Sequence, residues 1–140
     1  MIYKATTMGD INFHQYCDNK GPTVVLIQAN NSIFGGYSKC EWDSTRSKFC
    51  DDKTSFLFDL TKKEQYKINT SIYAIYNVSV TYILGYGYPD GIILFDKFLT
   101  KTNNKGIIGS CYGKSSEIGL AGGKKEFRVQ ELEVFTLNQV

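Results

Sequence analysis

The chain has 140 residues, a formal net charge of +2 and a sequence pI near 8.3, with 42% hydrophobic and 21% charged residues. This length predicts a single domain, residues 1–140, whose core is large enough to fold without a metal or a disulfide. The composition excludes wholesale disorder, and the mild charge gives no indication of nucleic-acid binding. Ten Tyr and nine Phe stand against two Pro, and this aromatic enrichment favours strands over helices.

No stretch of the sequence approaches the roughly 20 consecutive apolar residues of a membrane-spanning helix. The longest candidate, residues 82–95, is interrupted by glycine, proline and aspartate. The first residues, Met1 to Lys4, lack the apolar segment of a secretory signal. We therefore expect a cytoplasmic protein, or a fragment of a longer one, that does not insert into membranes.

The hydrophobic pattern predicts many short strands and little helix. The one expected helix covers residues 11–17, with Asp10 as its N-cap. The expected strands cover residues 2–5, 23–28, 32–38, 55–60, 65–68, 71–76, 78–84, 91–95 and 126–137.

Local patterns add detail to the first half of the chain. The continuous apolar run at residues 23–28 is typical of a strand covered on both faces. The following Asn30 and Asn31 predict a tight turn, because asparagine tolerates a left-handed backbone. Within the next strand, Gly35 and Gly36 indicate a bulge or close packing beneath an aromatic ring.

The polar segments predict loops. Residues 43–54 are polar and follow the hairpin, so we expect a loop there. Residues 100–106 are also polar and without a pattern, which predicts a mobile surface loop. In the last segment the parity of the apolar residues changes, and a β-bulge near Gln130 would reconcile the two halves.

The four cysteines, Cys17, Cys40, Cys50 and Cys111, show no Cys-x-x-Cys spacing. Neither a zinc knuckle nor a thioredoxin-like redox motif is therefore indicated. In a reducing compartment the simplest interpretation is four free thiols, several of them buried. A zinc site is an alternative in which folding brings Cys40 and Cys50 to Cys17 and the single histidine. We expect no metal and no cofactor.

His14 is the only histidine, three residues before Cys17 and four before Asp18. On a helix these residues are neighbours, so a base would lie beside a thiol. A structural hydrogen bond or cap is the alternative, and the lack of a third, orienting group favours it. A thiol-based antioxidant that uses Cys17 with His14 is one hypothesis for function, and it requires an exposed thiol with a lowered pKa.

Charge is uneven in the second half of the chain. Residues 97–128 hold seven Lys or Arg against two acids, which predicts a mildly basic surface. The favoured interpretation of such a surface is a solvated face. The alternative is a surface that binds an acidic protein or a lipid headgroup. Glu131 and Glu133 share parity on one strand, roughly 6–7 Å apart. That spacing serves acid–base chemistry only with a third group, so an acidic pair facing solvent or a partner is favoured.

Several sequence motifs occur together in a fixed order. Residues 17–23 read Cys-Asp-Asn-Lys-Gly-Pro-Thr, and about ten residues later residues 33–37 read Ile-Phe-Gly-Gly-Tyr. Further motifs are Gly-Tyr-Gly-Tyr-Pro-Asp at 85–90, Gly-Ser-Cys-Tyr at 109–112 and Val-Gln-Glu-Leu-Glu-Val-Phe at 129–135. In these motifs the chain resembles a TLDc domain over nearly its whole length.

The resemblance implies a mainly β fold, a sandwich of two antiparallel sheets with a few short helices. It also implies a link to oxidative-stress protection and to regulation of the vacuolar proton-pumping ATPase (V-ATPase) through direct protein contact. No catalytic mechanism is attached to the family, so the resemblance implies a protein that is not an enzyme.

We therefore predict a non-enzymatic interaction module that docks on a large protein assembly, such as the V-ATPase. Glu131 and Glu133 are the predicted partner contacts, with Lys124, Lys125 and Arg128 as a basic rim. A structural subunit of another large complex is an alternative that the sequence does not separate from this hypothesis.

Overall fold

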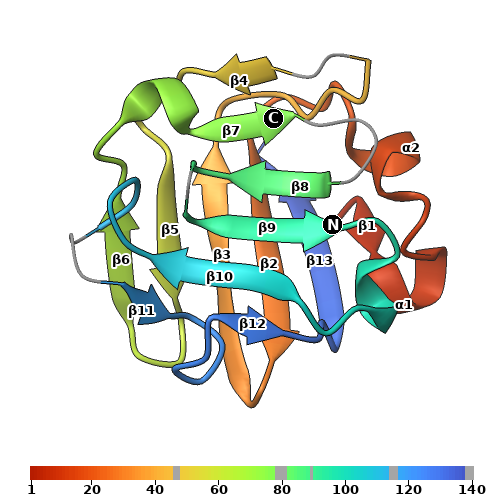
Figure 1. The fold of residues 1–140 in the computed structure, drawn as a ribbon. Coiled ribbons are helices and arrows are strands. Elements are labelled where there is room, and N and C mark those ends of the chain that lie inside the picture. Colours follow the sequence, from red (N-terminus) through yellow and green to blue (C-terminus); the bar gives the residue numbers. More distant parts are fainter. Residues whose placement is uncertain (46–47, 78–81, 89, 114–116, 138–140) are drawn as a thin grey trace.

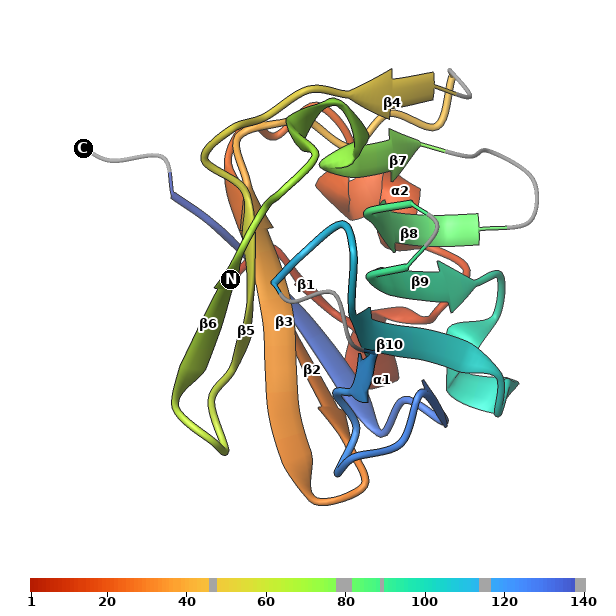
Figure 2. The same cartoon turned by 60° about the vertical axis from the view of Figure 1, so that its left-hand side comes forward.

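Two antiparallel sheets, packed face to face, form the fold in the computed structural model (Figures 1 and 2). The structure describes residues 1–45, 48–77, 82–88, 90–113 and 117–137. The two packed antiparallel sheets confirm the predicted β sandwich. The first sheet has six strands, in the order β1 (Tyr3–Lys4), β13 (Glu131–Thr136), β2 (Thr23–Ala29), β3 (Ser32–Ser38), β5 (Phe56–Asp59) and β6 (Glu64–Lys67).

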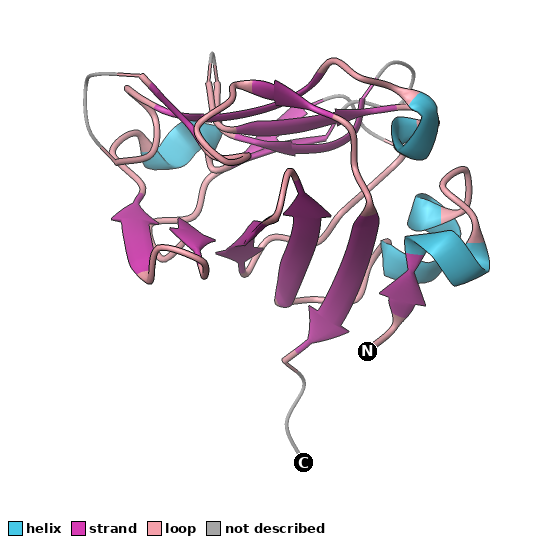
Figure 3. Ribbon diagram, turned by 90° about the horizontal axis from the view of Figure 1, so that it is seen from below, coloured by secondary structure: helices cyan, strands magenta, loops and turns pink. Residues whose placement is uncertain are grey.

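The second sheet lies against one face of the first, and Figure 3 shows the two as separate layers. Its main path runs in the order β11 (Ile118–Gly119), β10 (Asn104–Ile108), β9 (Ile92–Phe95), β8 (Tyr82–Tyr86), β7 (Ile75–Asn77) and β4 (Lys48–Cys50), and β12 (Glu126–Phe127) also pairs with β10. Of the expected strand at 78–84, residues 78–81 lie outside the described residues, and the rest belongs to β8.

Short helices lie beside β1 at one edge of the sandwich (Figure 1). They are α1 (Ala5–Met8) and α2 (Phe13–Cys17), and two 3₁₀ turns, η1 (Ser71–Tyr73) and η2 (Phe98–Thr100), lie elsewhere. The expected helix is confirmed in its second half, but its N-cap is Asn12 rather than Asp10. The Asp10 carboxylate instead accepts a hydrogen bond from the Leu99 amide at 3.1 Å. None of the described helices is long and apolar enough to cross a membrane.

The β2–β3 hairpin forms as the sequence predicts. Strands β2 and β3 pair over seven residues, from Thr23 with Ser38 to Ala29 with Ser32. Asn30 and Asn31 both have a left-handed backbone, at φ of 50° and 60°. Two consecutive left-handed residues match the twist of the flanking strands, which explains the Asn-Asn pair at this turn.

Close packing beneath an aromatic ring is confirmed at the glycine pair in β3. A Cβ atom on Gly36 would lie 2.7 Å from Cζ of Tyr86, a residue of the second sheet. The Tyr86 hydroxyl donates a hydrogen bond to the Gly36 carbonyl at 3.1 Å. Because Gly36 has no side chain, the two sheets can approach closely at this position. Its carbonyl then accepts the hydrogen bond of the buried Tyr86 hydroxyl.

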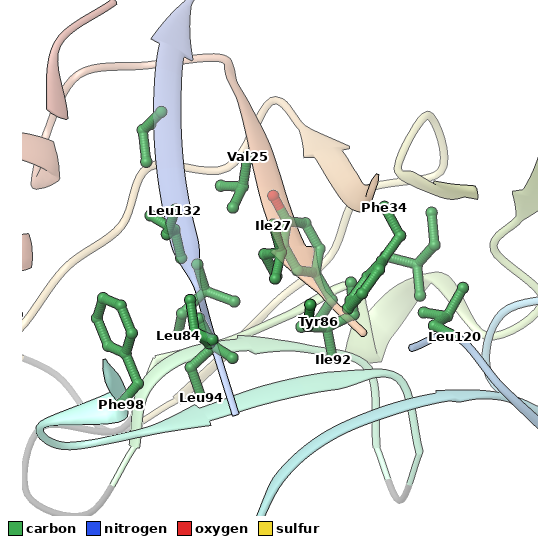
Figure 4. Close-up of a cluster of buried hydrophobic side chains, with 14 of the residues drawn as sticks. Val25, Ile27, Phe34, Leu84, Tyr86, Ile92, Leu94, Phe98, Leu120 and Leu132 are labelled. Carbon is green, nitrogen blue, oxygen red and sulfur yellow. The ribbon is translucent and has the colours of Figure 1, made fainter. Parts of the chain in front are cut away.

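The core lies between the sheets. Val25 and Ile27 of β2 point toward Leu84 and Ile92 of the second sheet (Figure 4). All four side chains are at most 1% exposed. By area, a fully buried side chain of this kind contributes roughly 1.5–3 kcal/mol to the free energy of unfolding.

The expected loop at residues 100–106 is wrong from Asn104 onward, although the exposed residues 101–103 lie outside the helices and strands. Residues from Asn104 onward form β10, and the Asn104 side chain is fully buried. Its amide donates to the carbonyls of Phe98 and Phe127, and its Oδ1 accepts from the Phe95 amide. A polar side chain thus satisfies buried backbone groups, so its polarity did not indicate exposure.

The expected β-bulge near Gln130 is also wrong. Phe127 of β12 pairs with β10 in the second sheet, whereas β13 begins at Glu131 in the first sheet. The chain crosses from one sheet to the other at this point, and the change of apolar parity marks that crossing. The expected loop at 43–54 similarly contains the edge strand β4.

Strand β2 is buried on one face only, contrary to the expectation from its continuous apolar run. Thr23, Val25, Ile27 and Ala29 are buried, whereas the alternate residues remain partly or fully exposed. The apolar residues among these alternates therefore lie on the outer face of the sheet.

Candidate functional site

The outer face of the six-stranded sheet points away from the second sheet, and none of the described elements covers it (Figure 2). Directly paired residues of an antiparallel sheet point to the same side, so the strand registers define rows of side chains across it. We use "outer face" for the side chains of Lys4, Val24, Leu26, Gln28, Ile33, Tyr37, Phe56, Phe58, Gln65, Lys67, Glu131, Glu133 and Phe135.

The first row of the outer face is apolar across four strands. Phe135 pairs with Val24, Val24 with Tyr37, and Tyr37 with Phe56. All four side chains are half-buried, and the centroids of the Tyr37 and Phe56 rings are 5.3 Å apart. A continuous row of partly exposed apolar side chains is a common feature of protein-binding surfaces.

The second row contains a hollow. It runs from Glu133 through Leu26, Gly35 and Phe58 to Gln65. A Cβ atom on Gly35 would lie only 1.8 Å from the Val25 carbonyl oxygen and 3.1 Å from Cζ of Phe58, so no other residue fits beneath the Phe58 ring. The hollow on this face has a volume of about 500 Å³ and is lined by Val24, Leu26, Phe56, Phe58, Asp59, Leu60, Lys63, Glu64 and Gln65.

The two predicted acidic contacts lie on the β13 side of this face but differ in their partners. Glu131 accepts hydrogen bonds from the Thr6 amide at 3.1 Å and from the Thr6 hydroxyl, which ties it to α1. Glu133 lies 3.9 Å from the Lys4 ammonium, and both side chains are partly exposed. Glu133 is therefore the more available of the two for a partner.

The opposite side of the outer face carries two lysines, together with the Asp59 and Glu64 that line the hollow. Lys67 of β6 lies beside Phe56, and Lys63 lies in the β5–β6 turn with a left-handed backbone. Both lysines are exposed. The outer face therefore has an apolar centre between two mixed-charge sides, one with Lys4 and Glu133 and the other with Lys63 and Glu64.

The predicted basic rim is only partly assembled next to the acidic pair. Arg128 donates from Nε to the Leu99 carbonyl and shares a hollow of about 460 Å³ with Thr6, the residue that binds Glu131. Lys124 and Lys125 lie in the segment that joins β11 to β12, which belong to the second sheet. Lys125 forms an ion pair there with Glu117 at 2.9 Å.

Cys17 has neither property of a reactive thiol. Its side chain is fully buried, and burial, reinforced by the Asp18 carboxylate, raises the pKa of the thiol to about 12. His14 Nδ1 lies 2.7 Å from Asp18 Oδ1, so the imidazole is engaged by the carboxylate. The structure thus argues against the thiol antioxidant hypothesis and favours the structural role of His14.

The expectation of four free thiols is wrong for two of them. Cys40, which follows β3, forms a disulfide with Cys50 at the end of β4, while Cys17 and Cys111 are free and buried. The disulfide also removes Cys40 and Cys50 from the zinc alternative. Within the described ranges, no three His, Cys, Asp or Glu residues gather where they could hold a metal ion.

Asp52 explains why the two cysteines meet. Its buried carboxylate accepts hydrogen bonds from the Ser38 hydroxyl and the Lys39 amide, both at 2.8 Å, and from the amide and hydroxyl of Thr54. Burial opposes ionisation of Asp52, but these hydrogen bonds outweigh it and lower its pKa. The carboxylate therefore holds the end of β3 against the segment that follows Cys50.

The comparison with known families now decides the identity of the fold. The family model of the TLDc domain matches residues 2–138. The chain belongs to the TLDc family. Among curated proteins, no sequence matches it. The resemblance carried by the Cys-Asp-Asn-Lys-Gly-Pro-Thr and Ile-Phe-Gly-Gly-Tyr motifs is therefore confirmed, and the chain is a TLDc-type module.

Sequence reasoning found the acidic pair of this TLDc module but missed the apolar surface beside it. The apolar run that contains Val24 and Leu26 predicts a strand buried on both faces, because such a run does not show which face is covered. The strand register shows which side chains share a face with this run, since it aligns Val24 with Phe135 and Leu26 with Glu133. The signal available in the sequence was the alternation of Phe56 and Phe58 beyond β3.

Proposed function

We propose that this TLDc module is not an enzyme and works in the cytoplasm by docking its outer face on a large protein assembly, such as the V-ATPase. The observation that supports this proposal is the uncovered apolar row from Phe135 to Phe56 with Glu133 beside it. Apolar and aromatic side chains ringed by charge are what protein interfaces use for affinity and register.

Under this proposal the residues have distinct roles. Val24, Leu26 and Phe56 supply apolar contact, and Glu133 supplies the charge that orients the partner. Glu131 is a predicted contact as well, although it also holds Thr6. The link to oxidative-stress protection then comes from the assembly that is bound, since the free thiols of this chain are buried.

Affinity purification from the native cell, followed by mass spectrometry, tests the proposal. Proton-pump subunits should be recovered with the natural chain and reduced roughly tenfold with Leu26→Ser or Glu133→Lys, because interface anchors and charges dominate binding. Lys101→Glu is the matched control, since Lys101 is exposed and lies outside the outer face. Equal recovery with all variants would reject the outer face as the docking surface.

The same purification separates regulation from a structural role. Recovery of a different stable assembly in fixed proportion would favour the structural-subunit hypothesis. Thermal melting of each variant should accompany the experiment, because a loss of recovery counts only where the melting temperature is retained. Glu131→Gln is unsuitable alone, because it also removes the hydrogen bonds to Thr6.

A further inference from the structure

The Cys40–Cys50 disulfide joins the two sheets at one end of the sandwich. Cys40 follows β3 of the first sheet, and Cys50 ends β4, the edge strand of the second sheet beside β7 (Figure 1). The two cysteines differ in access, because Cys40 is only 7% exposed whereas Cys50 is partly exposed. A thiolate attacks the disulfide sulfur that it can reach, so attack on Cys50 is favoured. The link is therefore open to thiol–disulfide exchange from solvent.

The chain before β4 is anchored without the disulfide. The Trp42 side chain is buried, and its Nε1 donates to the Thr23 hydroxyl at 3.2 Å. The Trp42 carbonyl accepts a hydrogen bond from the Asn19 amide at 3.0 Å. The Ser44 amide, two residues further on, donates to the Asp18 carboxylate at 2.8 Å. These contacts hold the chain before β4 against β2 and the end of α2, and none of them depends on the disulfide.

The chain after β4 is anchored as well. The Asp52 carboxylate accepts its four hydrogen bonds from Ser38, Lys39 and Thr54, and none of these bonds involves sulfur. The Asp52 amide also donates to the Ser71 carbonyl at 3.0 Å. Reduction of the disulfide therefore leaves the contacts on both sides of β4 in place. Only β4, which lies between the two anchors, loses a covalent restraint.

Few non-covalent contacts hold β4 itself. It pairs with β7 over three residues, and its other side pairs with none of the described strands. The centroid of the Phe49 ring lies 4.4 Å from that of Tyr76 and 4.7 Å from that of Tyr73. All three side chains are partly exposed, so water already reaches these ring contacts. A three-residue edge strand of this kind opens readily unless a further restraint holds it.

We propose that Cys50 is a site of thiol–disulfide exchange, and that reduction of the Cys40–Cys50 disulfide by a dithiol releases β4 from β7. In the oxidised chain the disulfide keeps β4 in place, because Cys50 cannot move away from Cys40 and an opened β4 gains little conformational freedom. In the reduced chain β4 opens, and the edge of β7 with the Tyr76 ring becomes accessible. The rest of the domain stays folded, because both anchors persist.

The reaction balances as a two-electron reduction. One thiolate of the dithiol attacks Sγ of Cys50 to form a mixed disulfide, while the bond to Cys40 breaks and its electron pair leaves on Sγ of Cys40. Cys40 takes a proton from solvent, and its thiol can donate to the Asp51 carbonyl oxygen, 3.8 Å from Sγ. The second thiol of the reductant then displaces Cys50 as a thiol, and the reductant leaves as a disulfide. Oxidised glutathione reverses the exchange and restores the link.

This exchange goes beyond the proposed docking function, and only its setting rests on the cytoplasm assigned there. In the cytoplasm, thiol pools reduce accessible disulfides, and those that form are mostly transient and catalytic or redox-sensing. β4 is then released under ordinary conditions and fixed to the sheet during oxidation. The redox state thereby sets whether the second sheet ends at β4 or at β7.

Trapping with a thioredoxin in which serine replaces the second active-site cysteine tests the site of attack. The folded, oxidised chain should form a mixed disulfide at Cys50, with about tenfold less at Cys40, because access decides which sulfur is attacked. Peptide mapping after acid quenching identifies the cysteine. Iodoacetamide added before the quench should leave the buried Cys17 and Cys111 unmodified. Labelling of these two thiols would show instead that the reductant reaches the disulfide only through global unfolding.

Hydrogen exchange read by mass spectrometry tests the release of β4. After reduction with dithiothreitol, amides in peptides that cover β4 should exchange about tenfold faster or more, because local opening exposes them to solvent. Amides of the β2–β3 hairpin should not change, since both anchors keep the rest of the domain folded. The double variant Cys40→Ser/Cys50→Ser is the matched control. It should exchange like the reduced natural chain, with or without dithiothreitol.

Three results would overturn the inference. The folded chain could form no mixed disulfide or carry it on Cys40, or β4 could exchange at the same rate in the oxidised and reduced chains. Loss of the cooperative thermal transition on reduction would also reject it, because the opening would then not be local. None of these measurements involves a partner, so they do not bear on the proposed docking function. Conversely, loss of that docking function leaves them intact.

Discussion

Both faces of the six-stranded sheet carry apolar side chains, but these side chains lie in different surroundings. On the inner face, Val25 and Ile27 are fully buried between the sheets. On the outer face, their neighbours Val24 and Leu26 are only half-buried, and none of the described elements lies over them. The same strand therefore carries two apolar sets, one enclosed by the protein and one presented to its surroundings.

This difference separates the apolar residues that are accounted for by folding from those that are not. Burial against the second sheet accounts for the inner set, because the transfer of each side chain out of water stabilises the folded state. The outer set stabilises the fold less, since much of its surface remains in water. Its order into rows on an uncovered face is the feature on which the proposed docking rests.

The largest expected effect separates the two faces within one strand. Ile27→Ala should lower the free energy of unfolding by about 2–5 kcal/mol, because it leaves a cavity in the core. Leu26→Ala should lower it by about 1 kcal/mol or less, because the site opens to solvent. Urea unfolding of both variants measures the contrast, and equal losses would break the distinction between the faces.

A smaller effect concerns the covalent link near one end of the sandwich. The Cys40–Cys50 disulfide closes a segment with a sequence separation of 10 residues. By loop-closure entropy such a link stabilises the oxidised chain by about 2–3 kcal/mol. Unfolding with and without a thiol reductant should show this loss, and Cys50→Ser should remove the dependence on reductant. A natural chain insensitive to reductant would contradict the disulfide.

Local chemistry made some parts of this fold predictable. The β2–β3 hairpin follows from two apolar segments around Asn30 and Asn31, which accept the left-handed turn. The close approach of the sheets follows from Gly36, where a side chain would collide with Tyr86. In both cases the residue type indicates the backbone geometry or the space that the fold requires at that position.

Other parts depend on contacts between distant segments, which local patterns do not contain. The polar pattern around Asn104 predicts a loop, because its partners, Phe98 and Phe127, come together only in the folded chain. The pairing of Cys40 with Cys50 accompanies the Asp52 hydrogen bonds that join the end of β3 to the segment after Cys50. The candidate site was predictable in its acidic pair, whereas its apolar row needed the register of four strands.

The two acidic residues of the outer face offer a finer contrast. Glu131→Gln should lower the free energy of unfolding by about 1 kcal/mol, because it weakens charge-assisted hydrogen bonds to Thr6. Glu133→Gln should cost about 0.5 kcal/mol or less, because an exposed pair with Lys4 contributes little. Denaturant unfolding at neutral pH checks both values. If Glu133 proves the more costly, its assignment to partner binding weakens.

The smallest expected effect is a dependence of stability on pH that comes from two carboxylates outside the outer face. Hydrogen bonds to Asp18 and Asp52 outweigh the effect of burial and hold the pKa of each carboxyl below its ordinary value of 3.8. A pKa lowered on folding stabilises the protein above the unfolded value, and this contribution is lost as pH falls through the folded pKa. The free energy of unfolding should therefore decline as pH falls below about 4, and Asp52→Asn should make that decline shallower. Urea unfolding at a series of pH values measures the slope, and a slope unchanged by Asp52→Asn would place the titrating carboxylates elsewhere, the outer face included.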